Sequence, residues 1–481
     1  MTKALVVLVI ALGIGLFTRT WQLLDRYYYS HDADLAAWVV KDLVLDGHPR
    51  LIGQLTSSPG IFIGPLFYYL LVPLYAISGF HPAATLFYSV FIGLFSIFSL
   101  YLVVAKIWGR TPAGLAACVY AASFSLSQTE RDVVPTTPVF LWTIWFIYSL
   151  HLILSGRRQG LFLAAVLFAA VWHIHLALGL LVVIPGAAAL LARRFRLTDY
   201  LLPSLVFCLL SLPLLLFEVK HNFMQTRSLL GTFGSATEQI ARTFGEKVLH
   251  VAGIALKDVN NLFWHRPDFI RPEILPGLLA ASFLVASLQV PRLRRFAVIF
   301  LAWFILLLGF FIRHPINLSE YYLNSLLVPV IIMAAIVLAR HKVIGALSVA
   351  AIVGLNLWLL ISSPVNAGGF LARESIVDYI AYDAAYHGYP CVAISYMVDP
   401  GNDLGYRFLF FRKNLHVNRP DSNSPVYTIV FPHPRANRLD FTFGSLGLVL
   451  PDYARYTQGG VAQSCSGQNS NLTDPMFGFT N

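Results

Sequence analysis

The class of this protein is indicated by its first 35 residues, which contain LVVLVIALGIGLFTRTWQLL (residues 5–24) followed by DRYYYSHDADL (residues 25–35). The first part is 20 residues long and almost entirely apolar, which is the length that an α-helix needs to cross a bilayer. It has no small-residue cleavage site, so we interpret it as a retained membrane span and not as a cleaved signal. The second part turns polar and acidic at once. The chain therefore opens with a membrane helix that leads into an acidic juxtamembrane segment.

The composition of the whole chain agrees with a membrane protein. Of its 481 residues, 57% are apolar and 12% are charged, whereas soluble domains carry about 25% charged residues. This excludes an ordinary soluble protein and a disordered one. The formal net charge is +10, but residues 367–481 hold 8 basic and 9 acidic side chains, so the positive charge belongs to the membrane part. Loops that face anionic lipid explain that placement, and no nucleic-acid partner is expected.

Ten further windows are apolar and long enough to be considered as spans. They are residues 85–105, 113–127, 134–154, 161–172, 178–192, 201–217, 274–289, 296–312, 323–339 and 343–361. Alternate connections between them are rich in Lys and Arg, namely residues 106–110, 155–160, 193–196, 291–295 and 340–342. Short cytoplasmic loops collect these residues. We therefore predict about 11 transmembrane helices in the cell membrane, with the N-terminus cytoplasmic and the C-terminus extracytoplasmic.

This orientation requires that residues 64–78 do not cross the bilayer. The segment has about a dozen apolar residues and two prolines, Pro65 and Pro73, which suits a re-entrant or interfacial helix. The first outer loop then runs over residues 25–82 and contains juxtamembrane helices. Tyr68 and Tyr69 lie in the re-entrant segment, where we expect them to line the approach of a lipid or an acceptor.

Residues 365–481 have a different composition and predict a small extracytoplasmic α/β domain beside the membrane domain of residues 1–364. The helical and strand-like stretches are residues 375–386, 391–396, 404–413 and 426–430, and residues 463–481 are typical of a loose tail. A disulfide between Cys391 and Cys465 is an open alternative, because an extracytoplasmic location permits it. The fold class is thus an all-α polytopic membrane protein with a small C-terminal α/β domain.

The acids after the first span are the main candidates for chemistry. Asp32 and Asp34 lie at the membrane edge, and a base that takes a proton from a sugar or protein hydroxyl must be a carboxylate or a histidine within hydrogen-bonding reach. The alternative is that Asp32 only caps the helix that follows it.

Four other polar clusters fall on the same outer side. They are Glu130, Arg131 and Asp132; His175; Glu218, Lys220 and His221; and Tyr321 and Tyr322. Each has a plain alternative: a solvated turn, a hydrogen-bonded histidine, a lysine that reaches the membrane surface, and an interfacial aromatic belt. A cation pair suits a phosphate or diphosphate group. No metal site is predicted, because His173 and His175 would point to different sides of a helix.

Several of these features together resemble a known family. The acidic segment after the first span, Leu51-Ile52-Gly53 with Thr56-Ser57, and Gly64-Pro65-Leu66-Phe67-Tyr68-Tyr69-Leu70 resemble the bacterial dolichyl-phosphate-mannose protein mannosyltransferase-like enzymes of the GT-C superfamily. The lipid A aminoarabinose transferases are similar in plan. The resemblance spans residues 5–339 in plan, and the segment from Gly64 to Leu70 is its most specific marker. Where the family commonly has Asp-Glu or Asp-Gln, this chain has Asp32-Ala33.

The resemblance implies a function and a set of roles. Asp32 corresponds to the catalytic Asp of the first loop, with Asp34 as the alternative, and Asp132 to a second outer-loop acid. Lys220, His221, Arg131, Tyr321 and Tyr322 would bind the donor phosphate, and Glu130, His175, Glu218, Tyr68 and Tyr69 are further polar site residues.

The expected enzyme is a glycosyltransferase that moves a sugar from a polyprenyl-phosphate donor to an extracytoplasmic acceptor, namely a protein, a lipid or a glycan. No cofactor is predicted, and a divalent cation is possible but not indicated. The alternatives are a transporter or lipid-linked sugar flippase, and a membrane anchor without catalysis. Most long spans lack central acids, which favours interfacial chemistry over a transport pathway.

Overall fold

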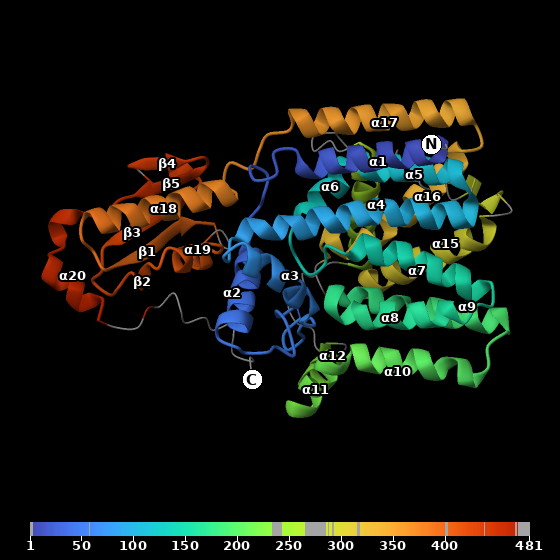
Figure 1. Ribbon diagram of the computed structural model, residues 1–481, viewed down its shortest axis with the longest axis horizontal. Coiled ribbons are helices and arrows are strands. Elements are labelled where there is room, and N and C mark those ends of the chain that lie inside the picture. The colour runs from blue at the N-terminus through green and yellow to red at the C-terminus, as the bar shows by residue number, and fades with distance from the viewer. Residues whose placement is uncertain are drawn as a thin grey trace.

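The computed structural model describes residues 3–56, 58–232, 243–264, 285–286, 288–290, 293–314, 318–399, 403–436, 438–466 and 469. Most of them form a bundle of helices, with a small sheet beyond one end of the bundle (Figure 1). The bundle contains α1 (Lys3–Thr20), α4 (Leu86–Trp108), α5 (Arg110–Ala122), α6 (Phe124–Arg131), α7 (Val139–Leu154), α8 (Gln159–Ile174), α9 (Val183–Ala192), α10 (Leu201–Leu210), α15 (Arg294–Arg313), α16 (Leu327–Leu338) and α17 (Lys342–Ser362). Their facing side chains form one large apolar core.

Within the described ranges, fewer helices are long and apolar enough to cross a membrane than the sequence windows predict. Among the described residues, four helices are long and apolar enough to cross: Pro82–Trp108, Arg294–Arg313, Tyr321–Leu338 and Lys342–Ser362. A bent pair, Leu197–Leu210 with Leu212–Lys220, makes a fifth if it counts as one span. Helices lie at every predicted window that the structure describes, while residues 274–289 fall mostly outside the described residues. A membrane protein is thus confirmed, and the count of eleven spans is not.

Three windows differ from single uninterrupted helices. The helix over residues 113–127 is broken at Ser123, whose backbone is not helical. The Ser123 hydroxyl caps α6 by accepting a hydrogen bond from the Leu126 amide. The helix predicted over 134–154 begins only at Val139, because the prolines before it cannot donate to a helix ladder. The window of residues 201–217 bends by 62° between α10 and α11 (Leu212–Lys220), and Pro213 lies in the first turn of α11.

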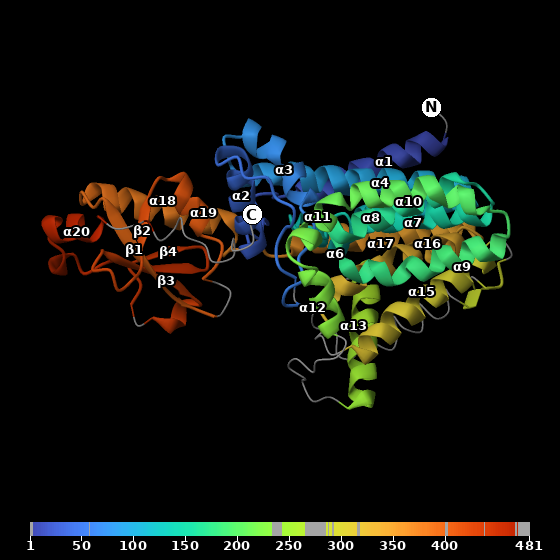
Figure 2. The same cartoon turned by 90° about the horizontal axis from the view of Figure 1, so that it is seen from below.

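The first outer loop forms α2 (His31–Leu45), a hairpin with a bridge between Leu55 and Phe62, and α3 (Leu66–Ile77). At about 1.5 Å per residue, the 12-residue α3 is roughly 18 Å long, which is too short to cross a hydrocarbon core of about 30 Å. In Figures 1 and 2, α2 and α3 lie between the bundle and the sheet.

Further helices of the membrane part lie between those already named. They are α12 (Met224–Thr232), α13 (Phe244–Phe263) and the short 3₁₀ helices Pro82–Thr85, Leu176–Val182, Leu197–Tyr200 and Glu320–Leu326. Figure 2 shows α13 running crosswise to the bundle.

The C-terminal part is a five-stranded mixed sheet with helices. Its elements are α18 (Phe370–Tyr386), β1 (Cys391–Val398), α19 (Arg407–Arg412), β2 (His416–Asn418), β3 (Val426–Phe431), β4 (Phe441–Phe443), β5 (Leu446–Val449) and α20 (Gln458–Ser464), with 3₁₀ turns at His433–Arg435 and Tyr453–Arg455. The strand order is β2-β1-β3-β5-β4. Strands β2, β1 and β3 are parallel, and β3, β5 and β4 are antiparallel. The predicted small α/β fold is confirmed, and most of the predicted tail lies outside the described residues.

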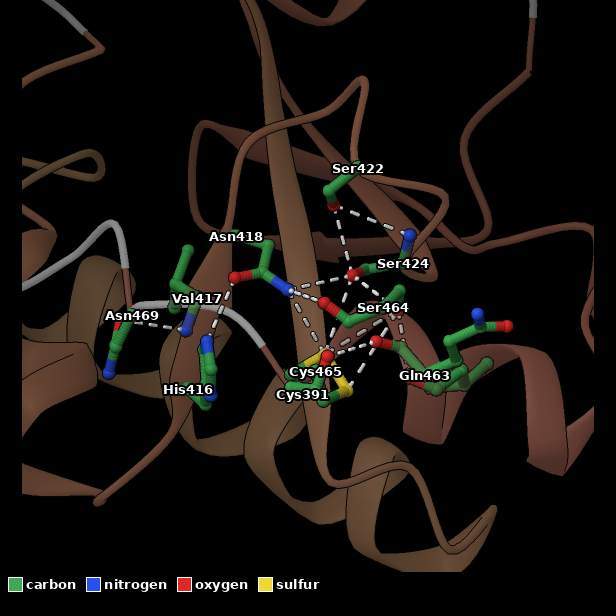
Figure 3. Close-up of a disulfide and its surroundings, with 12 residues drawn as sticks. Cys391, His416, Val417, Asn418, Ser422, Ser424, Gln463, Ser464, Cys465 and Asn469 are labelled. Atoms are coloured by element: carbon green, nitrogen blue, oxygen red, sulfur yellow. Dashed lines mark hydrogen bonds between the residues drawn. A yellow bond between two sulfur atoms is a disulfide. The ribbon is translucent and has the colours of Figure 1, made fainter.

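A disulfide joins Cys391 at the start of β1 to Cys465 after α20 (Figure 3). The alternative that the sequence left open is therefore realised. The Asn418 amide donates to the Ser424 hydroxyl beside it, over 3.0 Å, and ties β2 to the same corner of the sheet. Disulfides persist in oxidising compartments.

The first outer loop and the C-terminal part share one apolar core. It contains Phe408 of α19, whose ring contacts Trp38 of α2 and Tyr75 of α3. Buried side chains of α18, β1 and β3 belong to the same core. The two regions predicted as separate units are thus in direct contact at α2, which is the helix that carries the candidate acids.

Candidate functional site

Helix α2 begins at His31, and Ser30 occupies its N-cap position. Asp32 is therefore inside the first turn and is not the cap, so the alternative in which it only caps the helix is wrong. Acidic side chains in a first turn are favoured by the helix dipole. Because Asp32 does not cap the helix, its carboxylate can contact other parts of the first outer loop.

Asp32 is half-buried and is held by the rest of the first outer loop. Its Oδ1 accepts a hydrogen bond from the Gln54 side-chain amide over 3.3 Å. The Tyr68 hydroxyl in turn donates to the Gln54 Oε1 over 3.0 Å and accepts from the Gln54 backbone amide over 3.1 Å. The hairpin and the buried Tyr68 of α3 thus set the position of the Asp32 carboxylate.

The two tyrosines of the re-entrant segment hold the loop. The Tyr69 hydroxyl donates to the Arg50 carbonyl over 3.2 Å and accepts from the Arg50 amide over 3.0 Å. Tyr68 is fully buried, so its ring forms part of the core. Gln54, which joins Tyr68 to Asp32, was not predicted. It directly follows the Leu51-Ile52-Gly53 motif, and that position was the only signal for it.

Asp132 is a second carboxylate close enough to Asp32 to interact with it electrostatically. It follows α6, and its residue is exposed. Although part of the residue reaches solvent, the protein atoms packed around the carboxyl displace water from it and raise the pKa of Asp132 to about 6, and the negative charge of Asp32 contributes in the same direction. Asp32 and Asp132, which the sequence places far apart in the chain, thus lie within electrostatic range of each other.

A pocket of about 400 Å³ adjoins Asp132. Its wall includes Arg26 and Tyr28 after α1, Gln128 and Arg131 of α6, and Asn366 before α18. The Arg131 guanidinium is buried, and its Nη2 donates to the Thr18 carbonyl over 2.6 Å and to the Trp21 carbonyl over 2.9 Å.

Three nitrogens in this wall are unsatisfied. In the part of the chain that the structure describes, the Arg131 Nε and Nη1 and the Gln128 Nε2 have no hydrogen-bond partner. Buried donors normally have partners, so this wall is suited to groups that accept hydrogen bonds. Arg26 and Gln128 were not predicted from sequence.

Asp34 and Glu130 make other contacts. The Asp34 carboxylate is buried and accepts from the Tyr29 hydroxyl and the Phe408 amide. Glu130 forms a buried ion pair with Arg19 of α1, and it also accepts from the Tyr120 hydroxyl. Both carboxylates therefore join separate parts of the chain: Asp34 joins α2 to α19, and Glu130 joins α6 to α1.

The cluster after the seventh window makes contacts with neighbouring residues of its own segment. Lys220 is exposed at the end of α11, and the His221 ring stacks on Phe217 with centroids 4.1 Å apart. The Glu218 carboxylate accepts from the amides of Gln225 and Thr226, which start the next helix.

His175, Tyr321 and Tyr322 come together from two elements. The two tyrosine rings stack with centroids 4.5 Å apart, and the His175 ring lies edge-on to both at 5.6 and 4.9 Å. Their predicted roles stay predictions.

The part of the chain that the structure describes has one group with metal-binding spacing, Asp42, Asp46 and His48. Arg50 pairs with Asp42, and Lys41 pairs with Asp46 at 2.6 Å. Cations of the protein thus already neutralise these acids, and the group carries no metal assignment.

The helical bundle, the short α3 and the sheet domain beside the acidic α2 define a polytopic membrane protein with a C-terminal α/β domain. Residues 59–229 match the model of the dolichyl-phosphate-mannose-protein mannosyltransferase family. The resemblance to GT-C glycosyltransferases that the sequence indicated is therefore confirmed.

Two solved structures are similar to this chain. ArnT from Cupriavidus metallidurans, in a crystal structure with undecaprenyl phosphate, is similar over 96% of this chain and 99% of that chain, with 13% identity and a TM-score of 0.59. The oligosaccharyltransferase AglB from Archaeoglobus fulgidus, with an inhibitory peptide and a dolichol-phosphate, is similar over 89% of this chain and 69% of that chain, with 12% identity and a TM-score of 0.46. A comparison with curated protein sequences finds no match. The likeness to ArnT shows a shared fold, and the family match indicates glycosyltransferase activity.

Proposed function

We propose that this protein is a cell-membrane glycosyltransferase that moves a sugar from a polyprenyl-phosphate donor to an extracytoplasmic acceptor. The observation that carries the proposal is the pocket beside Asp132, whose wall holds unsatisfied donors on Arg131 and Gln128. The Asp32 carboxylate, from a separate element, lies within electrostatic range of Asp132. The family match over residues 59–229, which contain Asp132 and Arg131, supports the same reaction class.

The reaction is a single displacement with Asp32 as the base. The Asp32 carboxylate takes the proton of the acceptor hydroxyl or amine while the acceptor atom attacks the anomeric carbon of the sugar. The bond between that carbon and the phosphate oxygen breaks, and the polyprenyl phosphate leaves with the electron pair. The anomeric configuration inverts. A phosphate leaving group is already charged and needs no acid catalyst, unlike the leaving group of a glycosidase.

The phosphate needs cations and hydrogen-bond donors as its charge develops. Among the predicted cations, Arg131 has the best support, because its guanidinium is buried at the pocket wall and two of its nitrogens are unsatisfied. Lys220, His221, Tyr321 and Tyr322 remain proposed donor contacts. Lys220 is exposed and so is accessible to a lipid phosphate.

The test begins with the donor. Mass spectrometry of lipids that copurify with the protein identifies the lipid-linked sugar, and release of lipid phosphate from that donor measures the reaction. We expect Asp32→Asn to lower kcat by at least about 10²-fold, because a general base contributes 10²–10⁴-fold. The fold should survive, since Asp32 is half-buried and makes one long hydrogen bond.

The matched control is Asp46→Asn at the opposite end of α2, where the carboxylate pairs with Lys41. It should keep full activity. Full activity of Asp32→Asn would reject Asp32 as the base. Movement of the lipid-linked sugar across vesicles without cleavage of the sugar–phosphate bond would instead identify a flippase.

A further inference from the structure

We propose that Asp34 is a positioning residue: it fastens the first turn of α2 to helix α19 of the C-terminal domain and thereby holds Asp32 in place. The inference rests on the proposed function, because it concerns the orientation of the proposed base. It assigns to the C-terminal domain an indirect part in the active site: the domain holds α2, and α2 carries Asp32. The domain itself need not touch a substrate.

The hydrogen bonds of Asp34 are the first observation. Its Oδ1 accepts from the Phe408 backbone amide over 3.1 Å and from the Tyr29 hydroxyl over 3.1 Å. Phe408 lies in the first turn of α19, and Tyr406 at the N-cap position of that helix makes no side-chain cap hydrogen bond. A helix start needs acceptors for its free amides. The Asp34 carboxylate supplies one from a residue 374 positions earlier in the chain.

Helix geometry then separates the two acids. Residues two apart on an α-helix point about 200° away from each other, because each residue turns the chain by about 100°. Asp32 contacts the Gln54 side of α2, while Asp34 contacts the α19 side. Asp34 therefore does not share the position of Asp32 and is not a second base in the same place.

The α19 side of α2 is a continuous packing face. Trp38, one turn after Asp34, packs against Phe408 and Phe411 with ring centroids 5.7 and 5.2 Å away. The Lys41 ammonium lies 5.5 Å from the Phe411 ring. Residues i, i+4 and i+7 share one helix face, so α19 contacts α2 along two turns.

The turn before α19 is held just as firmly against the segment that leads into α2. Arg373 of α18 donates to the Leu404 carbonyl, and its guanidinium lies 4.6 Å from the Tyr406 ring. Gly405 has a φ of +88°, and a Cβ there would meet the Tyr29 carbonyl at 3.0 Å and the Arg373 Nη1 at 2.7 Å. Only glycine fits this approach.

A small displacement of α2 should reduce the rate of the reaction without weakening donor binding. A misplacement of about 1 Å costs on the order of 10²-fold in rate. We expect Asp34→Ala to lower kcat for lipid-phosphate release by about that factor, with KM for the donor within twofold. Asp34→Asn keeps an oxygen that accepts the Phe408 amide, so its kcat should stay within about threefold of the wild type.

Tyr29→Phe removes one of the two hydrogen bonds and should give a smaller loss of kcat in the same direction. Asp378→Ala is the control, because Asp378 lies on the outer surface of α18 and pairs with Lys413 of the same domain. It should leave the kinetics unchanged. If Asp34→Ala does not fold, Asp34→Asn and Tyr29→Phe carry the test.

Hydrogen exchange gives a readout that needs no turnover. Amides of α2 should exchange faster in Asp34→Ala and Tyr29→Phe than in the wild type, and not in Asp378→Ala. Unchanged exchange in both variants would overturn the positioning role, and a loss in Asp34→Asn as large as in Asp32→Asn would make Asp34 the base. If the wild type releases no lipid phosphate but the Asp34→Ala and Tyr29→Phe variants still exchange faster, the contact between α2 and α19 would be supported and only the proposed function would be rejected.

Discussion

Asp34 is a buried carboxylate whose ionisation opposes folding. Burial raises its pKa to about 6, and this outweighs the opposite effects of the Phe408 amide, the Tyr29 hydroxyl, Arg407 and Arg373. The unfolded chain has the ordinary value of about 3.9. The folded state therefore binds this proton more tightly, and the stability that it contributes is complete below about pH 4 and lost as the pH rises through about 6.

We predict that Asp34→Asn removes this pH dependence, which amounts to roughly 2–3 kcal/mol of the free energy of unfolding. The measurement is the apparent Tm of both proteins in detergent between pH 4 and pH 7.5. The wild type should lose Tm relative to Asp34→Asn as the pH rises, mainly between pH 4 and pH 6. Parallel curves would show that Asp34 does not titrate differently in the folded protein.

At the scale of elements, the start of α3 depends on a close approach to α8. The Gly64 amide donates to the Trp172 carbonyl over 2.7 Å, and a Cβ on Gly64 would lie 2.0 Å from the His173 Nδ1. The His173 Nδ1 also accepts from the Leu66 amide over 3.4 Å. The contact between α3 and α8 therefore requires glycine at position 64, at the start of the segment from Gly64 to Leu70. This contact positions Tyr68 and, through Gln54, Asp32.

Gly64→Ala should therefore destabilise the protein by about 1–3 kcal/mol, the usual cost of overpacking, and lower the rate of lipid-phosphate release. The apparent Tm and the release assay measure both effects. Gly13→Ala in α1 is the control, because a Cβ there meets no atom within 4 Å. Equal Tm values for the two variants would contradict the proposed contact.

At the scale of the whole molecule, the predicted orientation puts the sheet domain and the connection between α7 and α8 on opposite sides of the membrane. The disulfide between Cys391 and Cys465 supports an extracytoplasmic sheet domain, since disulfides are rare in the cytoplasm. Tyr386 is 76% exposed on α18, and Gln159 is exposed at the start of α8.

Cysteine labelling tests this orientation in a background where Cys118 and Cys208, the two free cysteines, are replaced by serine. Tyr386→Cys should react with an impermeant reagent added outside intact cells, and Gln159→Cys should react only after permeabilisation. The reverse pattern would place the candidate acids on the cytoplasmic side and would exclude an extracytoplasmic acceptor.

Features that are local in the chain could be predicted from the sequence. Apolar windows predicted helices wherever the structure describes them, the short strand-like runs predicted β1 and β3, and the segment from Gly64 to Leu70 indicated the family. Burial of apolar side chains and the hydrogen bonding of a helix depend on neighbours within a few residues, so these patterns are visible in the sequence.

The contacts between polar residues that are distant in the chain became visible in the three-dimensional structure. Asp132 lies near Asp32, Glu130 pairs with Arg19, and Asp34 caps a helix of the C-terminal domain. In the sequence Asp32 and Asp34 are nearly equivalent, two residues apart in one acidic motif. They differ because a helix turns them to opposite sides and because chain more than 370 residues away covers one side. Contacts between such distant residues follow from packing in three dimensions, which no local pattern records.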